Sequence, residues 1–409
     1  MMENKVLELY GMNIDFYQQR KEKLVKAYEY YFHEQPHAIF SSSGRIELLG
    51  NHTDHQHGKV LVATVDMDIL AATNRSDDKK VTIYSENHEA IEIDIDDLET
   101  KEDEKETSIA LVRGVLQGFV QAKLMIGGLH MRATSHLLEG VGVSSSAAFA
   151  MLLCVTLNYY YNNNSADAYT LAKIATYAEN AYFGKPSGLL DTLGIALGGI
   201  NCIDFTTLEQ PKIESLKWQL DGYILFLIHT GRDHTNLTGY YAQIYEDMKK
   251  VAKRCGKEYL GEVDSRLLVK KLPKLYHEVG GRAVLRAFHF FDENRRVERG
   301  YQCILNNDVR GFIDTINHSG ESSYKYLQNY YYSNDHEQGL ALAFNLSRRI
   351  LKNGACRVHG GGFAGTILAF VPTEGVKSFY EIFSAMYGDK NITRVIFRDS
   401  GATLVETLS

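Results

Sequence analysis

Residues 138–148 combine glycines and serines in a pattern that could bind phosphate. Gly140 and Gly142 stand two apart, and three serines, Ser144 to Ser146, follow at once. Glycines let the backbone turn tightly and approach a ligand closely. The serines precede a long apolar run, where a helix N-terminus would leave N–H groups unpaired, and such groups attract phosphate oxygens. A serine-capped helix after a tight turn would explain the same residues, so this stretch alone leaves both interpretations open.

This stretch differs from the two best-known nucleotide-binding motifs. A Walker A loop would continue with Gly-Lys-Ser or Gly-Lys-Thr, which the sequence lacks here. A dinucleotide-binding fingerprint would carry a third glycine where this chain has a serine. The pattern therefore predicts a phosphate-binding loop that belongs to neither motif.

Two further stretches favour the phosphate-binding interpretation. Residues 44–54 read GRIELLGNHTD, and residues 357–365 near the C-terminus read RVHGGGFAG. Together with residues 138–148, and in this order, they resemble the motif set of the galactokinase branch of the GHMP small-molecule kinases. The resemblance covers nearly the whole chain. It implies an α+β fold of two domains with the active site in the cleft between them. It also implies ATP- and Mg²⁺-dependent phosphorylation of the anomeric (C1) hydroxyl group of a sugar.

Asp191 is the expected general base. It lies in an apolar, glycine-flanked run, residues 188–194, with no neighbouring charge. The run resembles a family segment whose aspartate takes the proton from the anomeric hydroxyl group, although Thr192 replaces a glutamine there. A turn or helix-capping aspartate is the alternative. Arg45 matches the arginine of a family motif, and the resemblance places it near Asp191, where it would keep that carboxylate ionised and stabilise charge in the transition state.

The resemblance also implies residues that bind the nucleotide and its metal ion. Mg²⁺ would be held by the Glu179 carboxylate and the Ser146 hydroxyl group, which are ordinary ligands of this ion. Without the resemblance, Glu179 would be interpreted as a solvent-exposed residue of a helix. The nucleotide would contact the loop and the start of the following helix through Gly140, Gly142, Ser144, Ser145, Ser146 and Ala147.

The expected sugar-binding segment contains a cluster of His52, Asp54, His55 and His57. Such a cluster could bind a metal ion, but no group of carboxylates accompanies it in the sequence. In the family, the histidine and the aspartate of this segment donate and accept hydrogen bonds with sugar hydroxyl groups. The resemblance therefore implies that His52 and Asp54 bind the sugar.

Three more positions are expected to contact the sugar. The resemblance implies Asn51 beside the histidine, Gly188 near the expected base, and Tyr241. Tyr240 fits its place nearly as well as Tyr241, so the sequence leaves the choice between the two open. The glycine-rich residues 360–365 come before an apolar strand, and they predict a flexible loop over the nucleotide or the sugar.

Three departures from the family pattern bear on the substrate. Asn51 replaces a glutamate, Glu47 replaces an asparagine, and Leu138 replaces a proline before the phosphate loop. The asparagine would remove a negative charge that repels a sugar acid, and it would offer that acid an N–H donor. The sequence therefore predicts a kinase for galactose or a close relative, with galacturonate or another C6-modified galactose as the alternative substrate. Two weaker alternatives are a non-catalytic sugar- and ATP-binding sensor, disfavoured because Asp191 and Arg45 are both present, and a GHMP kinase for a non-sugar alcohol, disfavoured by the His-Thr-Asp segment.

The elements that must position these residues mix strands with helices in both halves of the chain, which is typical of an α+β fold. We expect a boundary between an N-terminal kinase domain, residues 1–205, and a C-terminal kinase domain, residues 206–409. The helix 165–183 should begin at Ser165 as its N-cap and end at Gly184. Strands are expected at 38–40, 46–49, 59–73, 81–84, 91–95, 129–137, 200–205, 223–229, 366–371 and 393–397. Further helices are expected at 12–33, 104–123, 149–157, 235–255, 281–305, 308–320 and 336–352.

Composition excludes several classes of protein. The chain has 409 residues, enough for two domains, and 44% hydrophobic with 23% charged residues is typical of a globular protein. A net charge of −7 without a basic stripe argues against nucleic acid as a partner. The sequence has no long apolar run. It therefore predicts neither a membrane partner nor a signal segment. Five scattered cysteines favour reduced thiols and a cytoplasmic location. The expected ligands are a small-molecule sugar and ATP, bound by a monomer or a weak homodimer.

Overall fold

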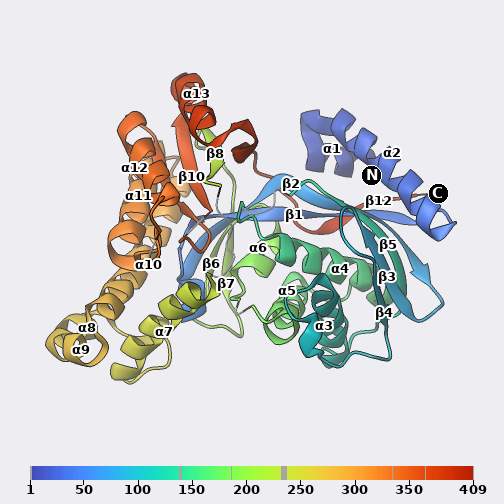
Figure 1. Cartoon of the computed structure of the whole chain (residues 1–409), viewed down its shortest axis with the longest axis horizontal. Helices are drawn as coiled ribbons and strands as arrows, with labels where there is room; N and C mark the ends of the chain where they lie inside the picture. Colours follow the sequence, from blue (N-terminus) through green and yellow to red (C-terminus); the bar gives the residue numbers. More distant parts are fainter. Residues whose placement is uncertain are drawn as a thin grey trace.

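Two β-sheets, each packed against helices, organise the molecule (Figure 1). The computed structural model describes residues 2–137, 141–185, 187–231, 237–333, 335–363 and 365–408. The larger sheet has eight strands in the order β12-β1-β2-β5-β3-β4, with β6 paired to β2 and β7 paired to β6. Its strands are β1 (Ala38–Leu49), β2 (Lys59–Ser76), β3 (Lys80–Ser85), β4 (Ile91–Asp94), β5 (Gly128–Ser135), β6 (Ile200–Asp204), β7 (Lys212–Leu216) and β12 (Thr403–Thr407).

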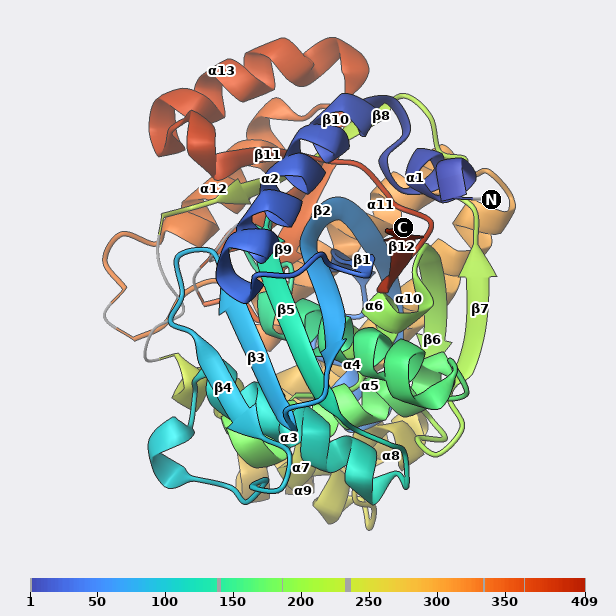
Figure 2. The same ribbon diagram turned by 90° about the vertical axis from the view of Figure 1, so that its right-hand side faces the viewer.

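Different helices cover the two faces of the larger sheet (Figures 1 and 2). Side chains alternate between faces along a strand. In β1, Ile39 packs with the N-terminal helices while its neighbour Phe40 packs in the main core, and Leu70 and Ala71 of β2 repeat this alternation. Because both faces are covered, every residue of β1 is buried. The N-terminal helices are α1 (Met2–Tyr10) and α2 (Ile14–Phe32), and the other face carries α3 (Ser108–Gln121), α4 (Ser145–Asn162), α5 (Ala168–Tyr177), a π-helical turn (Ala178–Phe183) and α6 (Leu190–Leu197).

The smaller sheet is antiparallel and has the strand order β11-β8-β10-β9. One of its faces, which includes Leu227 and Leu368, joins the main core of the larger sheet, whereas Ile228 and Ile367 pack with α12 and α13 on the other face. A single core therefore links the two sheets. The strands are β8 (Tyr223–His229), β9 (Ala355–His359), β10 (Thr366–Pro372) and β11 (Ile392–Val395), and the helices are α7 (Thr238–Arg254), α8 (Ser265–Lys270), α9 (Leu272–Val279), α10 (Gly281–Leu305), α11 (Val309–Ser322), a π-helical turn (Ser323–Leu327), α12 (Gly339–Ile350) and α13 (Val376–Tyr387).

None of the helices formed by the described residues is long and apolar enough to cross a membrane.

The helix expected over residues 165–183 is observed as α5 followed by the π-helical turn. Ser165 as its N-cap is wrong, because the Asp167 side chain caps the helix by accepting a hydrogen bond from the backbone N–H of Thr170 at 2.8 Å. Gly184 ends the segment in the left-handed conformation, as predicted. The cap therefore lies two residues further along the chain than expected.

Two strands that follow residue 205 in the chain complete the larger sheet. β7 pairs antiparallel with β6, and β12 pairs antiparallel with β1. The sequence predicts neither strand, since both are short and rich in polar residues. The division into domains 1–205 and 206–409 stays a prediction, and any such division must leave these two strands with the first sheet.

Candidate active site

A carboxylate–guanidinium pair lies at the centre of the candidate site. Arg45 extends from the middle of β1, and Asp191 lies in the first turn of α6, where the helix dipole stabilises a negative charge. The Arg45 Nε and Nη2 atoms lie 2.8 and 2.7 Å from Asp191 Oδ1. The two side chains that the sequence analysis expects to lie together are thus in direct contact, while their roles in catalysis stay predictions.

Three neighbours keep Asp191 ionised. Burial alone would raise the pKa of this carboxyl group, but the charges of Arg45 and Lys185 and the hydrogen bond from the Ser144 hydroxyl group to Oδ2 together lower the pKa below its usual value. Asp191 therefore carries a negative charge at neutral pH, with a hydrogen bond to each of its oxygens.

The phosphate loop is held against this pair by its backbone. Arg45 Nη1 donates a hydrogen bond to the carbonyl oxygen of Gly142 at 2.7 Å. Gly142 (φ +82°) and Ser144 (φ +62°) both adopt left-handed conformations that lead the chain into α4. Gly140, the first glycine of the predicted loop, lies outside the described residues.

The serines of the loop do not cap α4. The Ser144 hydroxyl group donates to Asp191, and the Ser146 hydroxyl group donates to Glu179 at 2.6 Å. No side-chain cap is found at the N-terminus of α4, so the alternative of a serine-capped helix is wrong. The predicted nucleotide contacts Ser145 and Ala147 begin the helix, Ser145 exposed and Ala147 buried. An uncapped N-terminus of an 18-residue helix favours an anion at this place.

Glu179 is a fully buried acid in the π-helical turn after α5. Its Oε1 accepts hydrogen bonds from Ser146 Oγ and, at 3.4 Å, from Lys185 Nζ. Its Oε2 has no hydrogen-bond partner in the described part of the chain. A solvent-exposed helix residue, the interpretation without the resemblance, is therefore wrong. An unpaired buried carboxylate oxygen beside a hydroxyl group is a donor set that Mg²⁺ accepts, so these residues fit the expected metal ion.

Two residues near the site have no role in the sequence analysis. Lys185 is the only charged residue among residues 180–190, and its isolation there is the signal that could have identified it. Its ammonium group pairs with Glu179. His359 stands just before the glycine-rich loop, and burial together with Arg45 and Arg357 lowers the pKa of its ring well below the usual value.

Asp54 lies directly against Gly188. A Cβ atom at residue 188 would stand 2.0 Å from Asp54 Oδ2, so only a glycine allows this approach. Burial, followed by the nearby negative charge of Asp191, raises the pKa of Asp54 to about 7. The expected sugar ligands Asp54 and Gly188 are thus next to each other and within electrostatic reach of the expected base.

His52 and His55 form a neutral hydrogen-bonded pair. His52 Nδ1 lies 3.3 Å from His55 Nε2, and His52 Nε2 lies 2.9 Å from the carbonyl oxygen of Gly361. Burial lowers the pKa of His52 to about 4 and that of His55 to about 3. Among the described residues, no group of three His, Cys, Asp or Glu side chains is arranged to hold a metal ion. Both ring nitrogens of His52 are used within the protein, and the residue ties the sugar-binding segment to the glycine-rich loop.

The amide group of Asn51 is buried and fully used within the protein. Its Nδ2 donates to the carbonyl oxygen of Gly360 at 2.8 Å and to Glu47 Oε1 at 3.2 Å. Its Oδ1 accepts from Asn329 Nδ2 at 2.9 Å and from Ser323 Oγ at 3.4 Å. The residue is 1% exposed. Both donors and both acceptor positions are occupied within the protein, which favours a positioning role, while a direct contact between Asn51 and the sugar stays a prediction.

Glu47 continues this buried network to the smaller sheet. Its Oε1 accepts from Arg357 Nη2 at 2.5 Å, and Arg357 Nη1 donates to the carbonyl oxygens of Glu47 and Leu48. A guanidinium group with no exposure therefore joins β9 to β1. The two substitutions that the sequence analysis assigns to substrate choice, at positions 47 and 51, are in contact with each other instead.

Tyr241 lies on the first turn of α7 against the glycine-rich loop. Its hydroxyl group donates to the carbonyl oxygen of Gly362 at 3.2 Å, and a Cβ atom at Gly361 would lie 2.4 Å from its ring. Tyr240 packs with Tyr332 and Phe363. Tyr241 is therefore the tyrosine in hydrogen-bond contact with the loop, while a contact of either tyrosine with the sugar stays a prediction. Residues 232–236, which precede this helix, lie outside the described part.

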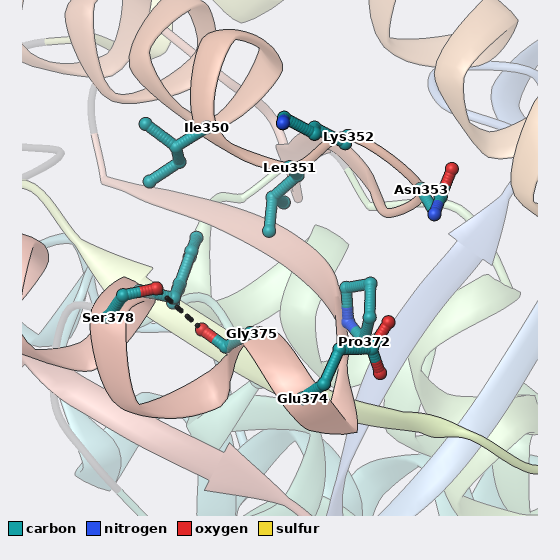
Figure 3. Close-up of a pocket in the computed structure, with 9 residues that line it drawn as sticks. Ile350, Leu351, Lys352, Asn353, Pro372, Glu374, Gly375 and Ser378 are labelled. Atoms are coloured by element: carbon teal, nitrogen blue, oxygen red, sulfur yellow. Dashed lines mark hydrogen bonds between the residues drawn. The ribbon is translucent and has the colours of Figure 1, made fainter.

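A surface pocket is lined by residues other than those of the candidate active site (Figure 3). It is formed where α12 ends, β10 ends and α13 begins, and the Ser378 hydroxyl group donates to the carbonyl oxygen of Gly375 at its rim. None of the expected site residues lines it. The residues that line it are Ile350, Leu351, Lys352, Asn353, Pro372, Glu374, Gly375, Ser378 and Phe379.

Comparisons with known proteins point to one family. A model of the galactokinase galactose-binding signature matches residues 26–75, and a model of the N-terminal domain of GHMP kinases matches residues 110–199. The galactokinase of Pyrococcus furiosus is 30% identical over 342 residues, which cover 82% of this chain and 90% of that protein. The galactokinase of Lactobacillus helveticus is 29% identical over 377 residues, 90% of this chain and 94% of that protein.

A solved structure shares the fold. The crystal structure of Lactococcus lactis galactokinase complexed with galactose superposes with a TM-score of 0.83 at 23% identity, covering 93% of this chain and 99% of that chain. The mevalonate kinase of Methanococcus jannaschii superposes with a TM-score of 0.59 at 12% identity over 88% of this chain and 98% of that chain. The expected α+β fold of two domains is confirmed by this likeness.

Proposed function

The chain belongs to the galactokinase family of GHMP kinases, and from this premise we propose that it transfers the γ-phosphoryl group of ATP to the anomeric C1 hydroxyl group of galactose. It is a sugar kinase with ATP as the second substrate. The observation that carries the proposal is the contact of Asp191 with Arg45 beside the loop that leads into α4. A carboxylate for the acceptor hydroxyl group and an uncapped helix for phosphate are the two parts that phosphoryl transfer needs side by side.

In the proposed reaction, Asp191 accepts the proton of the anomeric hydroxyl group. The C1 oxygen forms a bond to the γ-phosphorus atom, the bond from that phosphorus to the bridging oxygen breaks, and its electron pair leaves with ADP. A carboxylate with a lowered pKa is a weak base, but in a loose transition state the proton leaves late, so orientation matters more than basicity. Arg45 would hold Asp191 in place and neutralise developing charge.

On the nucleotide side, we propose that the backbone around Gly142 and the N-terminus of α4 bind the phosphates through residues Ser144 to Ala147. Glu179 Oε2, which lacks a partner in the described part of the chain, and the Ser146 hydroxyl group would hold Mg²⁺. When bound, the ion supplies positive charge against the phosphate oxygens. Lys185 would supply a further positive charge beside Glu179.

On the sugar side, Asp54 and the backbone at Gly188 are the proposed contacts, with His52 and Tyr241 around them. Asp54 carries the argument, because its carboxylate lies against the segment that holds Asp191. Asn51 would position the sugar-binding segment by holding it against the glycine-rich loop.

Galactose is favoured over galacturonate because the contacts of Asn51 weaken the case for a sugar acid. The sugar acid was expected because Asn51 removes a repelling negative charge and offers an N–H donor. Both N–H groups of that amide already donate to Gly360 and Glu47, and the neighbouring Glu47 carboxylate supplies negative charge there. A non-catalytic sensor is disfavoured because the pair of Asp191 and Arg45 is intact. Family membership favours a sugar over another alcohol.

Measurement of ADP release tests the proposal. The protein is mixed with MgATP and, in turn, with galactose, galacturonate, glucose and mevalonate. We expect turnover with galactose, and a product whose phosphorus resonance is that of a sugar 1-phosphate. Turnover with galacturonate and not with galactose would identify galacturonate as the substrate. Binding of galactose and ATP without ADP release would identify the protein as a sensor.

Three further properties stay part of the proposal. The protein is proposed to be cytoplasmic, because its five cysteines are free and buried. It is proposed to be a monomer or a weak homodimer, which sedimentation analysis at several concentrations would test. The boundary between kinase domains is proposed near residue 205.

A further inference from the structure

His359 is a buried histidine whose ring nitrogens lack a well-formed hydrogen bond among the described residues. It ends β9, its side chain is 1% exposed, and in the described part of the chain neither Nδ1 nor Nε2 has a hydrogen-bond partner of good geometry. Buried polar groups are nearly always paired, since an unpaired one loses its hydration without replacement. A buried ring whose nitrogens lack a well-formed hydrogen bond among the described residues is a candidate for contact with a bound ligand.

Thr366, the neighbour of His359 on the adjacent strand, is also buried without a hydrogen-bond partner among the described residues. Thr366 of β10 is the cross-strand neighbour of His359, it is 1% exposed, and its hydroxyl oxygen also lacks a partner among the described residues. Neighbours in register point to the same face of a sheet. Two buried polar side chains side by side, neither with a well-formed hydrogen bond among the described residues, indicate a place for a polar ligand.

The face in question is the one that meets the candidate active site. Along β9, Arg357 and His359 share a face because they are two residues apart, and Arg357 binds β1 through Glu47 and Leu48. A Cβ atom at Gly142 would lie 3.6 Å from His359 Cδ2 and 4.0 Å from Nε2. The Nε2 edge of the ring therefore faces the backbone of the phosphate loop.

The charges around the ring fix its protonation state. Burial, with the positive charges of Arg45 and Arg357, lowers the pKa of His359 well below the usual value, against the opposing effects of Asp191 and of the nearby Gly142 backbone. The ring is therefore neutral and carries one N–H donor and one acceptor nitrogen. It lies where the loop proposed for the nucleotide phosphates meets the proposed base.

We propose that His359 is a substrate-contacting residue that donates a hydrogen bond from its ring to an oxygen of the transferred phosphoryl group. This inference rests on the proposed function. The group in transit has to lie between the phosphate loop and the base, and the Nε2 edge of His359 faces that place from the smaller sheet. No proton is transferred in this step: the ring keeps its N–H, the anomeric proton goes to Asp191, and the bridging oxygen leaves with ADP. A donor of this kind acts most strongly on the transition state, in which charge spreads onto those oxygens.

Variants that keep or remove the donor test the role. His359→Gln keeps an N–H donor, His359→Phe fills the space without one, and His130→Gln changes a histidine of β5 outside the site as a control. For His359→Phe we expect kcat to fall about 10- to 1000-fold, with both KM values within about threefold of wild type. His359→Gln should recover at least a tenth of wild-type kcat, and His130→Gln should match wild type. Circular dichroism and thermal unfolding identify variants that have lost their fold.

A measurement on the wild-type protein covers the case in which His359→Phe does not fold. Histidine ring nitrogens are labelled with ¹⁵N, and the His359 signals are assigned by their absence from His359→Gln. Adding ADP, Mg²⁺, aluminium fluoride and galactose should shift these signals, because the fluoride complex imitates the transferred group. Unchanged signals, or a folded His359→Phe with kcat within threefold of wild type, would overturn the inference while the kinase activity stands. A wild-type protein without kinase activity would overturn the proposed function and this role with it.

Discussion

Asp191 and Asp54 are close enough for their charges to interact, yet their environments move their pKa values in opposite directions. Positive neighbours and a hydroxyl group hold the pKa of Asp191 below its usual value, whereas burial and the charge of Asp191 raise that of Asp54 to about 7. At the residue scale, two carboxylates thus have different chemistry because of their surroundings alone. Each difference gives a prediction.

Replacing the proposed base should remove turnover and leave binding. Asp191→Asn keeps the shape of the side chain but cannot accept the anomeric proton, so kcat should fall about 10²- to 10⁴-fold. Calorimetric titration should show galactose and ATP binding within about threefold of wild type. If the variant kept more than about a tenth of wild-type turnover, with the chemical step shown to limit the rate, Asp191 would not be the base.

Asp54 should make stability depend on pH. Its pKa is about 7 in the folded protein against an ordinary value of 3.8. The folded state therefore keeps a proton that the unfolded state has lost, and stability falls as pH rises from about 4 to about 7. Asp54→Asn removes this loss, so its free energy of unfolding should exceed that of wild type by about 1 to 3 kcal/mol at pH 8, and less as the pH approaches 4. Urea denaturation at pH 5 and pH 8 measures this.

Asp96→Asn is the matched control, because Asp96 is a largely exposed partner of Lys79. It should show no such dependence on pH. An Asp54→Asn difference that was equal at both pH values would mean that the Asp54 carboxylate is well solvated in the folded protein.

At the scale of elements, the site depends on three loop segments, of which the sugar-binding one includes a 3-10 helical turn at Asp54–Gln56. The sugar-binding segment after β1 and the glycine-rich loop after β9 meet through the side chains of Asn51 and His52, which both reach backbone carbonyl groups of that loop. The phosphate loop before α4 is held by Arg45 of β1. Strands β1 and β9 thus position all three loops.

The exchange of residue types at positions 47 and 51 gives a double-mutant test. Glu47 Oε1 lies 3.2 Å from the Asn51 amide nitrogen, so Asn51→Glu places a second carboxylate beside Glu47. The substitution also removes the donor to the Gly360 carbonyl oxygen. The free energy of unfolding should fall by about 2 to 5 kcal/mol. Adding Glu47→Asn restores one carboxylate within reach of Arg357 and should recover more than half of that loss.

Urea denaturation of wild type, both single variants and the double variant measures the coupling. Substrate preference is measured on the same proteins. If Asn51→Glu were as stable as wild type and changed the ratio of kcat/KM for galactose and galacturonate, then Asn51 would contact the sugar after all.

Substitutions of two glycines should distinguish the nucleotide-binding site from the sugar-binding site. Gly142→Val puts a branched side chain at a residue with φ +82°, where the backbone is proposed to approach phosphate, so KM for ATP should rise at least about 10-fold. Gly188→Ala puts a methyl group 2.0 Å from Asp54 Oδ2, so KM for galactose should rise instead. Steady-state kinetics with each substrate varied in turn measures both. A rise in the KM for galactose alone in Gly142→Val would show that the loop binds the sugar.

The sequence predicted those parts of the site whose residues are close together in the chain. The loop 138–148 and the run around Asp191 could be identified because each is a local pattern of glycines, serines and one charge. The role of Asn51 could not be predicted, because its partners Ser323, Asn329 and Gly360 are about 270 to 310 positions away and only tertiary packing brings them together. His359 was missed for a similar reason, since its surroundings among the described residues are a property of the folded chain.

At the scale of the whole molecule, one core holds both sheets together. Leu227 and Leu368 of the smaller sheet share a cluster with Phe40 and Leu61 of the larger one. The site is assembled across this junction, with Arg45 on the larger sheet and His359 on the smaller. A division of the chain near residue 205 therefore separates sequence motifs more cleanly than it separates packed cores.

The single tryptophan of the chain reports on this junction. The Trp218 ring lies 5.5 Å from Phe312 of α11, 6.3 Å from Phe370 of β10 and 4.8 Å from Phe397, measured between ring centroids. Because the core is continuous, we expect urea denaturation followed by Trp218 fluorescence and by far-ultraviolet circular dichroism to give the same midpoint.

Leu368→Ala, in the shared core, should lower both midpoints together and reduce the free energy of unfolding by about 2 to 5 kcal/mol. Ile367→Ala is the matched control, since Ile367 packs on the outer face with α12 and α13. If the outer face alone could melt, Ile367→Ala would move the circular dichroism curve ahead of the fluorescence curve, and two midpoints in the wild-type protein would mean that the two sheets unfold as separate units.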